Sequence, residues 1–168
     1  MSVSTPPRKP SATKPHGPHV GRSLQRLLRD YASPDAMGRI AIVRRGIPAT
    51  AVTVLVDALA LPNEQVAAGI AIPVPTLNRK LKARTALSPT ESERVAGLVQ
   101  LVSMVERWTA ELGDRTPAEF VPMAWLGQWL TTPNPALGDE RPLALLDTAE
   151  GRTLVGNVLG SLESGAFW

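Results

Sequence analysis

Apolar residues recur along most of the chain at the three- and four-residue spacing of helices that bury one face. The first example is Leu24, Leu27, Leu28 and Tyr31, which fall on one side of a helix. No segment of useful length alternates apolar and polar residues as a half-buried strand would. The pattern therefore predicts an all-α fold. The expected helices cover residues 21–31, 34–45, 48–59, 64–70, 76–84, 89–112, a segment through 125–130, and 149–164.

Residues that favour helix starts and stops punctuate this pattern. The strongest start is Ser88-Pro89-Thr90-Glu91, because Ser88 can cap the helix and Glu91 can reach back to the cap. A similar signature occupies residues 116–119, but Pro122 interrupts it, so we expect a short turn before the next helix. The other expected caps and stops are Ser33, Asn63, either Asp147 or Thr148, Gly46, Gly113 and Gly165. The last helix should bury Leu154, Val155, Val158, Leu159 and Leu162.

Composition narrows the class of protein. Hydrophobic residues make up 43% of the chain and aromatics only 4%, so aliphatic side chains must fill the core, which favours packed helices. No run of 18 apolar residues is present to span a membrane. The absence of Cys excludes disulfides and Cys-ligated zinc. We expect a cytoplasmic protein without a cofactor, with a disordered basic tail of five prolines over residues 1–20.

The charge of the chain is divided between its two halves. Residues 1–90 hold 13 Lys and Arg against 4 Asp and Glu, whereas residues 91–168 hold 5 against 11. The first half therefore carries a net charge of +9 and the second a net charge of −6. This asymmetry predicts two surfaces with different partners, and nucleic acid is the usual partner of a basic one.

The basic half contains the pattern of a helix-turn-helix, in which two short helices follow a longer supporting helix. The second short helix, 76–84, is the predicted reader of the DNA major groove. Leu77 and Leu81 should face the core. The remaining polar side chains suit contacts to bases and phosphates, although an ordinary solvated face is the alternative. These candidate DNA-binding residues are Thr76, Asn78, Arg79, Lys80, Lys82 and Arg84.

The acidic half carries most of the large aromatic side chains. Trp125 and Trp129 are four residues apart on one helix, so we expect them to anchor the core. Phe167 and Trp168 end the chain, where they need a cover from their own domain, a second subunit or another protein. Arg152 stands in the first turn of the last helix, where a cation opposes the helix dipole. We expect the Arg152 side chain to have an external partner on another molecule or a tertiary partner within this chain, or else to be an ordinary exposed arginine.

The acidic half also resembles a known protein family. Its run includes Trp125-Leu126, then Pro133-Asn134-Pro135-Ala136-Leu137-Gly138, then Arg141-Pro142-Leu143-Ala144-Leu145-Leu146, and ends in Leu162-Glu163-Ser164-Gly165-Ala166-Phe167. This run resembles the C-terminal toxin-binding domain of the Xre/MbcA/ParS antitoxins. The upstream segments 76–80 and 87–94 are similar to the Xre-type helix-turn-helix of that family and its following helix. The resemblance covers roughly residues 37–168.

The resemblance implies an antitoxin of a type II toxin–antitoxin pair that is not itself an enzyme. Its partner would be a RES-domain toxin that depletes NAD, neutralised by occlusion of the toxin's active site. The basic domain would repress the shared operon as a homodimer on operator DNA. The implied domains are a helix-turn-helix domain over 21–112 and a toxin-binding domain over 113–168. The expected toxin-binding residues are Arg152, Glu163, Gly165, Phe167 and Trp168.

Two other classes of function compete with this expectation. A stand-alone regulator would use the acidic half only to dimerise or to sense a ligand. An enzyme is excluded by the lack of Cys and of a Gly-rich phosphate loop. The only two histidines, His16 and His19, could pair on a metal, but their Pro-rich surroundings favour solvated side chains. The carboxylate pairs Glu91/Glu93 and Asp139/Glu140 are expected to be solvated too.

Overall fold

The computed structural model describes residues 18–32, 35–113, 117 and 119–163, and within them it is all-helical, as predicted. Two isolated bridges, Pro48–Ala86 and Asn134–Glu140, are the only β-type pairings recorded there. No helix in the described part is long and apolar enough to cross a membrane. The helices are α1 (Pro18–Tyr31), α2 (Ala36–Arg45), α3 (Thr50–Leu59), α4 (Asn63–Gly69), α5 (Val74–Ala83), α6 (Pro89–Leu112), α7 (Pro122–Thr131) and α8 (Ala149–Glu163), with short 3₁₀ turns η2 (Pro135–Leu137) and η3 (Pro142–Leu145) before α8.

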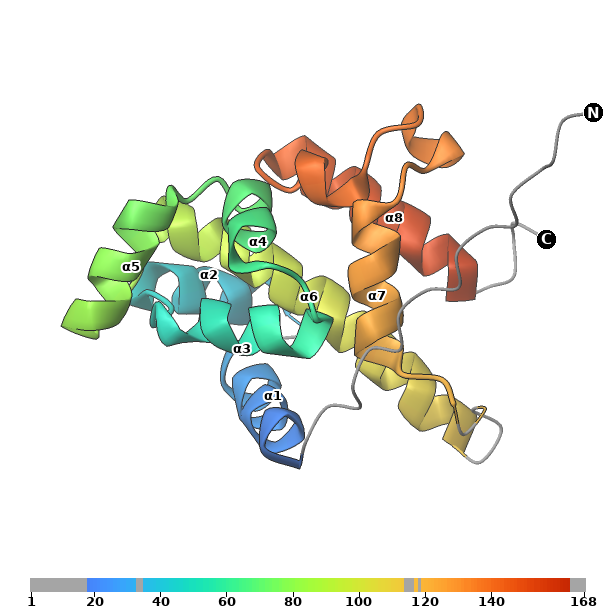
Figure 1. The fold of residues 1–168 in the computed structure, drawn as a ribbon, viewed down its shortest axis with the longest axis horizontal. Helices are drawn as coiled ribbons and strands as arrows, with labels where there is room; N and C mark the ends of the chain where they lie inside the picture. Colours follow the sequence, from blue (N-terminus) through green and yellow to red (C-terminus); the bar gives the residue numbers. More distant parts are fainter. Residues whose placement is uncertain (1–17, 33–34, 114–116, 118, 164–168) are drawn as a thin grey trace, which may run out of the picture.

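The long helix α6 joins the two ends of the molecule (Figure 1). At one end, α4 and α5 form the expected pair of short helices, with α2 and α3 beside them. The helices α7 and α8 also pack against α6, and α8 lies along α6 from Glu93 near its start to Met104 near its middle. The apolar residues spaced along α6 are buried, and these are Val95, Leu98, Val99, Val102 and Val105. Trp108, farther along α6, is half-buried and packs on the same core.

A single hydrophobic core runs through both halves of the chain. It contains Leu55 and Leu77 from the basic half together with Leu126, Leu146 and Leu159 from the acidic half, all fully buried. The helix α4 also contacts η3, and α3 contacts α7. The two halves that differ in charge therefore share one packed interior rather than meeting through a flexible linker.

Several helix starts differ from those predicted. Asp35 caps α2 by accepting a hydrogen bond from the Gly38 N–H at 2.7 Å, whereas the predicted cap, Ser33, lies outside the described residues. Asn63 is the first helical residue of α4 and not its cap, because Pro62 holds the extended cap conformation. Pro48 precedes α3, which begins at Thr50. These errors arise because prolines and short polar residues fit both the cap and the first turn.

The α6–α7 connection contains the expected turn, and one of the two expected caps of α8 is present. The signature at 116–119 starts no helix in its described residues, and α7 begins at Pro122 after the expected turn. Thr148 is the cap of α8, since its Oγ1 accepts from the Gly151 N–H at 3.0 Å. The stops at Gly46 and Gly113 are confirmed, and Gly165 lies outside the described residues.

Two glycines let the halves approach closely. Gly127 on α7 faces the backbone carbonyl of Leu59 at the end of α3, and a β-carbon there would run into that carbonyl oxygen. A β-carbon on Gly69 of α4 would meet the side chain of Leu143 in η3. Because both glycines are buried, the contact between the halves depends on the absence of side chains at these positions.

We predict that Gly127→Ala lowers the free energy of unfolding by about 1–3 kcal/mol, because the new methyl must displace backbone rather than a flexible side chain. Gly160→Ala on α8 is the matched control. Its methyl meets only the flexible end of Met104 at 3.5 Å, so it should raise stability by about 0.5–1 kcal/mol. Urea unfolding followed by circular dichroism checks both values. Equal stabilities for the two variants would contradict the close α3–α7 contact.

Candidate functional site

The turn between α4 and α5 is set by backbone hydrogen bonds. Ala71 adopts a left-handed conformation with φ of 48°. Its N–H donates to the Ala68 carbonyl at 3.0 Å, and the Ile72 N–H donates to the Ala67 carbonyl at 2.9 Å. These two bonds form a Schellman motif, which ends a helix sharply. The turn therefore sends the chain directly into α5, which begins at Val74 and not at the predicted Thr76.

The exposed side of α5 carries amide and cationic side chains. Leu77 is fully buried and Leu81 is half-buried, as predicted. The opposite side exposes four of the six candidate DNA-binding residues, and we call these four the α5 outer face: Asn78, Arg79, Lys82 and Arg84. Thr76 is half-buried. The structure therefore collects an amide and three guanidinium or ammonium groups on one helix, the chemistry that contacts base edges and phosphates.

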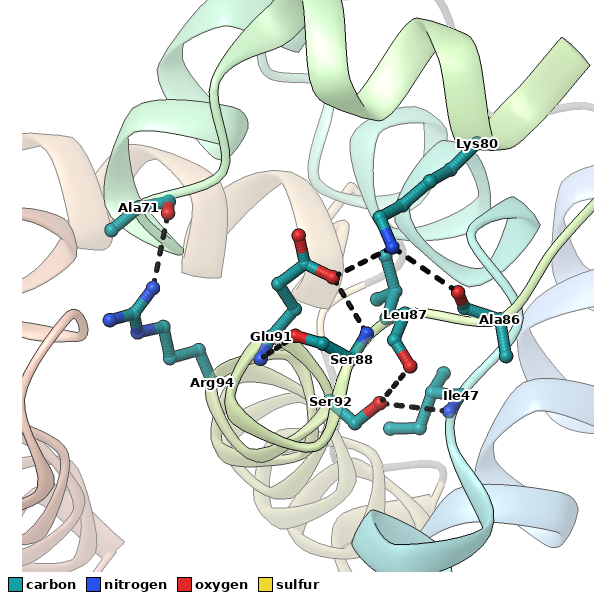
Figure 2. A network of polar contacts seen from close by, with 9 residues as sticks. All are labelled: Ile47, Ala71, Lys80, Ala86, Leu87, Ser88, Glu91, Ser92 and Arg94. Atoms are coloured by element: carbon teal, nitrogen blue, oxygen red, sulfur yellow. Dashed lines mark hydrogen bonds and ion pairs between the residues drawn. The ribbon is translucent and has the colours of Figure 1, made fainter.

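Lys80 does not share that face. Its Nζ lies 3.2 Å from Glu91 Oε2 and 3.5 Å from the Ala86 carbonyl oxygen, and its side chain is only 20% exposed. The sequence analysis groups Lys80 with the other candidate cations of this helix. Its partner carboxylate, Glu91, lies on a different helix, so local spacing does not reveal the ion pair. In the fold, Lys80 fastens α5 to the start of α6 (Figure 2).

Arg84 ends α5 in a strained backbone conformation. Its φ is 53°, in the left-handed region that glycine adopts at no steric cost. The N–H of Thr85 donates to the Lys80 carbonyl at 3.1 Å and closes the end of the helix. A residue with a β-carbon costs about 1–2 kcal/mol in this conformation, so a glycine would serve the turn better. The exposed guanidinium is the feature that glycine would lack.

The first turn of α6 touches three other parts of the basic half (Figure 2). Glu91 completes the predicted capping box with Ser88, accepting from the Ser88 N–H at 2.7 Å, and also pairs with Lys80. The buried Ser92 accepts from the Ile47 N–H at 3.0 Å and donates to the Leu87 carbonyl at 3.3 Å. Arg94 donates to the Ala71 carbonyl in the α4–α5 turn at 3.1 Å.

The same turn also reaches the acidic half. Glu93 forms an ion pair with Arg152 of α8 at 2.6 Å, and Arg152 donates to the Leu146 carbonyl at 3.1 Å. The Arg152 side chain is only 13% exposed and lies against Gly97, which leaves room for it. Arg152 therefore has the tertiary partner that was one of its three expected environments. Glu91 is not solvated as expected, because it is largely covered and pairs with Lys80 of α5. Glu93 is exposed, as expected, although it also pairs with Arg152.

The outward side of α8 presents an apolar residue that the sequence placed inside. Leu154 is 46% exposed, whereas its neighbours Val155 and Leu159 are fully buried. Glu150 and Asn157, one turn to either side, are exposed as well. Glu163 is exposed at the end of the helix. The other expected toxin-binding residues, Gly165, Phe167 and Trp168, lie outside the described residues.

The aromatic side chains of α7 form a row that is only partly covered. Trp125 and Trp129 stack with ring centroids 6.5 Å apart, and both pack on the core, as expected. Phe120 lies 6.2 Å from Trp125 and is 36% exposed. Of the histidine pair, His16 lies outside the described residues and the side chain of His19 is not described. No cluster of three metal-ligating side chains occurs in the described part of the chain.

Comparisons with known proteins match both halves of this arrangement. Residues 38–100 match the antitoxin Xre-like helix-turn-helix domain, which spans α2 to the middle of α6. Residues 120–165 match the antitoxin Xre/MbcA/ParS C-terminal toxin-binding domain, which spans α7 and α8. The chain belongs to the Xre/MbcA/ParS antitoxin family. It is an antitoxin with a helix-turn-helix domain and not an enzyme, and the toxin-binding domain sets aside the stand-alone regulator.

Two relatives agree with this assignment. A protein of Sphingobium sp. (strain YBL2) named "Prs ADP-ribosylating antitoxin" is 35% identical over 136 residues, which cover 81% of this chain and 83% of the relative. The "Antitoxin Xre" of Yersinia enterocolitica serotype O:8 / biotype 1B (strain NCTC 13174 / 8081) is 27% identical over 158 residues, covering 83% of this chain and 99% of the relative. Helix α1 precedes both matched domains, so the domain matches leave it without an assigned role.

We predict that Glu91→Gln destabilises the antitoxin by about 1 kcal/mol at neutral pH, through loss of the charged contact to Lys80. Burial alone would raise the pKa of Glu91, but hydrogen bonds from Ser88 and Lys80 outweigh it and hold the pKa below its ordinary 4.5. The contribution of the carboxylate is therefore complete above that ordinary value and disappears as the pH falls through the lowered pKa.

Thermal unfolding at several pH values measures this difference between the wild-type protein and Glu91→Gln. The gap should be full at neutral pH and close in acid. Glu140→Gln removes an exposed carboxylate and should show no such gap. A gap that widens as the pH falls would contradict the role given to Glu91.

Proposed function

We propose that this antitoxin represses its own operon by placing α5 in the major groove of operator DNA, and that it neutralises a RES-domain toxin that consumes NAD. Both actions take place in the cytoplasm. The proposal rests on the separation of two surfaces in one rigid chain. The α5 outer face is cationic and lies at one end of α6, while α8 presents its exposed side in the acidic half (Figure 1).

The DNA-binding part is supported by the positive charge exposed on α5 and beside it. Acidic residues are absent from residue 65 to residue 90, so nothing within that segment opposes the cations of α5. Arg84 stands at the end of α5 with its side chain exposed and adds a guanidinium to these cations. Arg44 and Arg45, exposed at the end of α2, add positive charge for backbone phosphates.

We predict that Arg84→Gly separates stability from DNA binding. Relief of the left-handed strain should raise the free energy of unfolding by about 1 kcal/mol, while affinity for operator duplex falls. Arg79→Ala should cost about 1–3 kcal/mol of binding if its guanidinium forks onto a guanine. Fluorescence anisotropy with the operator duplex measures affinity, and wild-type binding should weaken steeply with added salt.

Arg141→Ala provides the matched control for these variants. It removes one exposed cation from the acidic half and should leave operator affinity unchanged. Salt-insensitive binding by the wild-type protein, or equal losses in Arg141→Ala and Arg79→Ala, would contradict binding through α5.

The toxin-binding part is supported by the exposed side of α8. Leu154 is an apolar side chain left in solvent between Glu150 and Asn157, inside the segment that matches the toxin-binding domain. An apolar centre within a polar rim is the usual arrangement of a protein interface. The acidic half would steer electrostatically toward a basic toxin cleft. Glu163, Gly165, Phe167 and Trp168 would extend this contact into the toxin's active site.

The chemistry of the toxin is inferred from the family and one relative. The resemblance implies a RES-domain toxin that depletes NAD. The Sphingobium relative carries ADP-ribosylation in its name. A toxin that transfers ADP-ribose takes that group from NAD. A toxin that hydrolyses NAD and a toxin that transfers ADP-ribose would therefore both consume NAD. We therefore propose an NAD-consuming toxin and leave the acceptor of the ADP-ribose group to experiment.

We predict that Leu154→Asp abolishes protection from the toxin, because a charge in the apolar centre of the contact would be desolvated without a partner. Deletion of residues 166–168 should leave the fold intact and weaken neutralisation. Cellular NAD in cells that express the adjacent toxin gene together with each variant is the measurement. Ile40→Asp, at a comparably exposed residue of α2, is the control that should still protect. Full protection by Leu154→Asp would show that another face carries the contact.

A further inference from the structure

Helix α1 lies outside both matched family domains, yet it belongs to the same packed interior. Leu24 and Leu27 are buried, and α1 packs against α3 and α6. Its outward side carries three exposed arginines at the spacing of one helix face, which are Arg22, Arg26 and Arg29. Burial therefore accounts for the leucines of α1 but not for this row of cations.

Two of these arginines border a pocket between α1 and α3, which we call the α1–α3 pocket. Its volume is about 480 Å³. Arg22 and Arg26 line it from α1, together with Ser23 and Tyr31, and Thr50 lines it from the start of α3. Guanidinium and hydroxyl groups are the donors with which proteins hold phosphate oxygens. The pocket therefore has the chemistry of a phosphate site.

The charge around the pocket is mainly positive. Of the described residues that line it, Asp30 alone carries a carboxylate, and that carboxylate lies 3.8 Å from the guanidinium of Arg29. Burial and Asp30 raise the pKa of Tyr31, and Arg45 at the end of α2 acts in the opposite direction. The charge of Arg45 is therefore close to the pocket as well. This balance favours an anionic ligand.

The pocket is joined through the backbone to the end of α5. Arg84 is followed by Thr85, whose carbonyl accepts a hydrogen bond from the Ala49 N–H at 3.2 Å. Ala49 lies between Pro48 and Thr50, which both line the pocket. The path from Arg84 to the edge of the pocket is therefore at most about 13 Å long. A major groove is about 12 Å wide, so bases at α5 and backbone beside that groove can belong to one duplex.

We infer that the α1–α3 pocket holds a backbone phosphate of operator DNA beside the groove that α5 enters. The inference rests on the proposed repressor and adds to it a contact that carries no sequence information. Arg26 donates to the phosphate from α1, and Thr50 faces it from α3. Because phosphate contacts fix the position of a protein on the duplex, α1 holds the DNA while α5 reads it.

Neutralising Arg26 tests this contact. Arg26→Gln should weaken binding to the operator duplex, and to an unrelated duplex of the same length, by the same factor of about ten. The slope of log affinity against log salt should fall by about 1, because one phosphate contact is lost. Fluorescence anisotropy at several salt concentrations measures both quantities. Circular dichroism should show unchanged helix content, since the Arg26 side chain is exposed.

Two further variants separate a phosphate contact from a change in net charge. Arg26→Lys keeps the positive charge and should retain most of the affinity and of the salt slope. Arg141→Gln removes one exposed cation from the acidic half and should match the wild-type protein. Equal losses in Arg141→Gln and Arg26→Gln, or unchanged affinity and slope in Arg26→Gln, would overturn the inference.

Operator duplexes with single neutral methylphosphonate linkages locate the phosphate. At one linkage beside the site of α5, this change should weaken binding of the wild-type protein about tenfold. The same linkage should leave Arg26→Gln unaffected, because that variant has already lost the contact. If every linkage that weakens the wild-type protein weakens Arg26→Gln equally, the pocket holds no phosphate.

Comparison with Arg79→Ala separates failure of this inference from failure of the proposed function. If Arg79→Ala loses its preference for the operator while Arg26→Gln behaves as the wild-type protein, the repressor stands and the phosphate contact fails. If Arg26→Gln weakens on both duplexes while Arg79→Ala keeps its operator preference, the phosphate contact stands and reading by α5 fails. An Arg26→Gln protein that binds DNA normally but no longer retains the toxin in a pull-down would assign the pocket to the toxin and overturn the inference.

Discussion

The structure depends on the first turn of α6, where four consecutive residues hold four different parts of the chain. Glu91 fixes the end of α5 through Lys80, and Arg94 fixes the α4–α5 turn through the Ala71 carbonyl. Ser92 hydrogen-bonds to the backbone of both Ile47 and Leu87, and Glu93 forms an ion pair with Arg152 of α8. The Ser92 hydrogen bonds are buried and the Lys80–Glu91 pair is largely covered, so solvent weakens these contacts less than it weakens surface ion pairs. The helix-turn-helix and the toxin-binding domain therefore share a common support.

This arrangement gives physical meaning to the charge asymmetry of the chain. The α5 outer face and exposed arginines of α1 and α2 present the outward cations of the basic half, while Lys80 is neutralised at the boundary by Glu91 from the acidic half. Arg152 and Glu93 form the reverse case, a cation on the toxin-binding side held by a carboxylate at the start of α6. The charges at the boundary thus stabilise the junction, and those farther from it remain exposed for partners. One hydrophobic core beneath both groups keeps the two binding surfaces fixed relative to each other.

The fold was largely predictable, because helix periodicity and the capping box at Ser88 are local properties of the sequence. The inward position of Leu77 and the stops at Gly46 and Gly113 follow from the same local rules. The candidate surfaces were less predictable. Whether Lys80 points outward depends on Glu91 of another helix, and whether Leu154 is buried depends on how α8 is rotated against α6 and the two 3₁₀ turns. A helical stripe of five apolar residues is wider than the contact that α8 makes, so periodicity alone could not identify the one left exposed.

We propose that one chain presents separate surfaces to DNA and to a toxin. Hydrogen exchange measured by mass spectrometry on the free antitoxin, the operator complex and the toxin complex distinguishes these surfaces. Operator DNA should protect the segment around α5, residues 74–84, and leave α8 unchanged. The toxin should protect residues 149–163 and leave α5 unchanged. Protection of α5 by the toxin, or of α8 by the operator, would contradict the separation of the two surfaces.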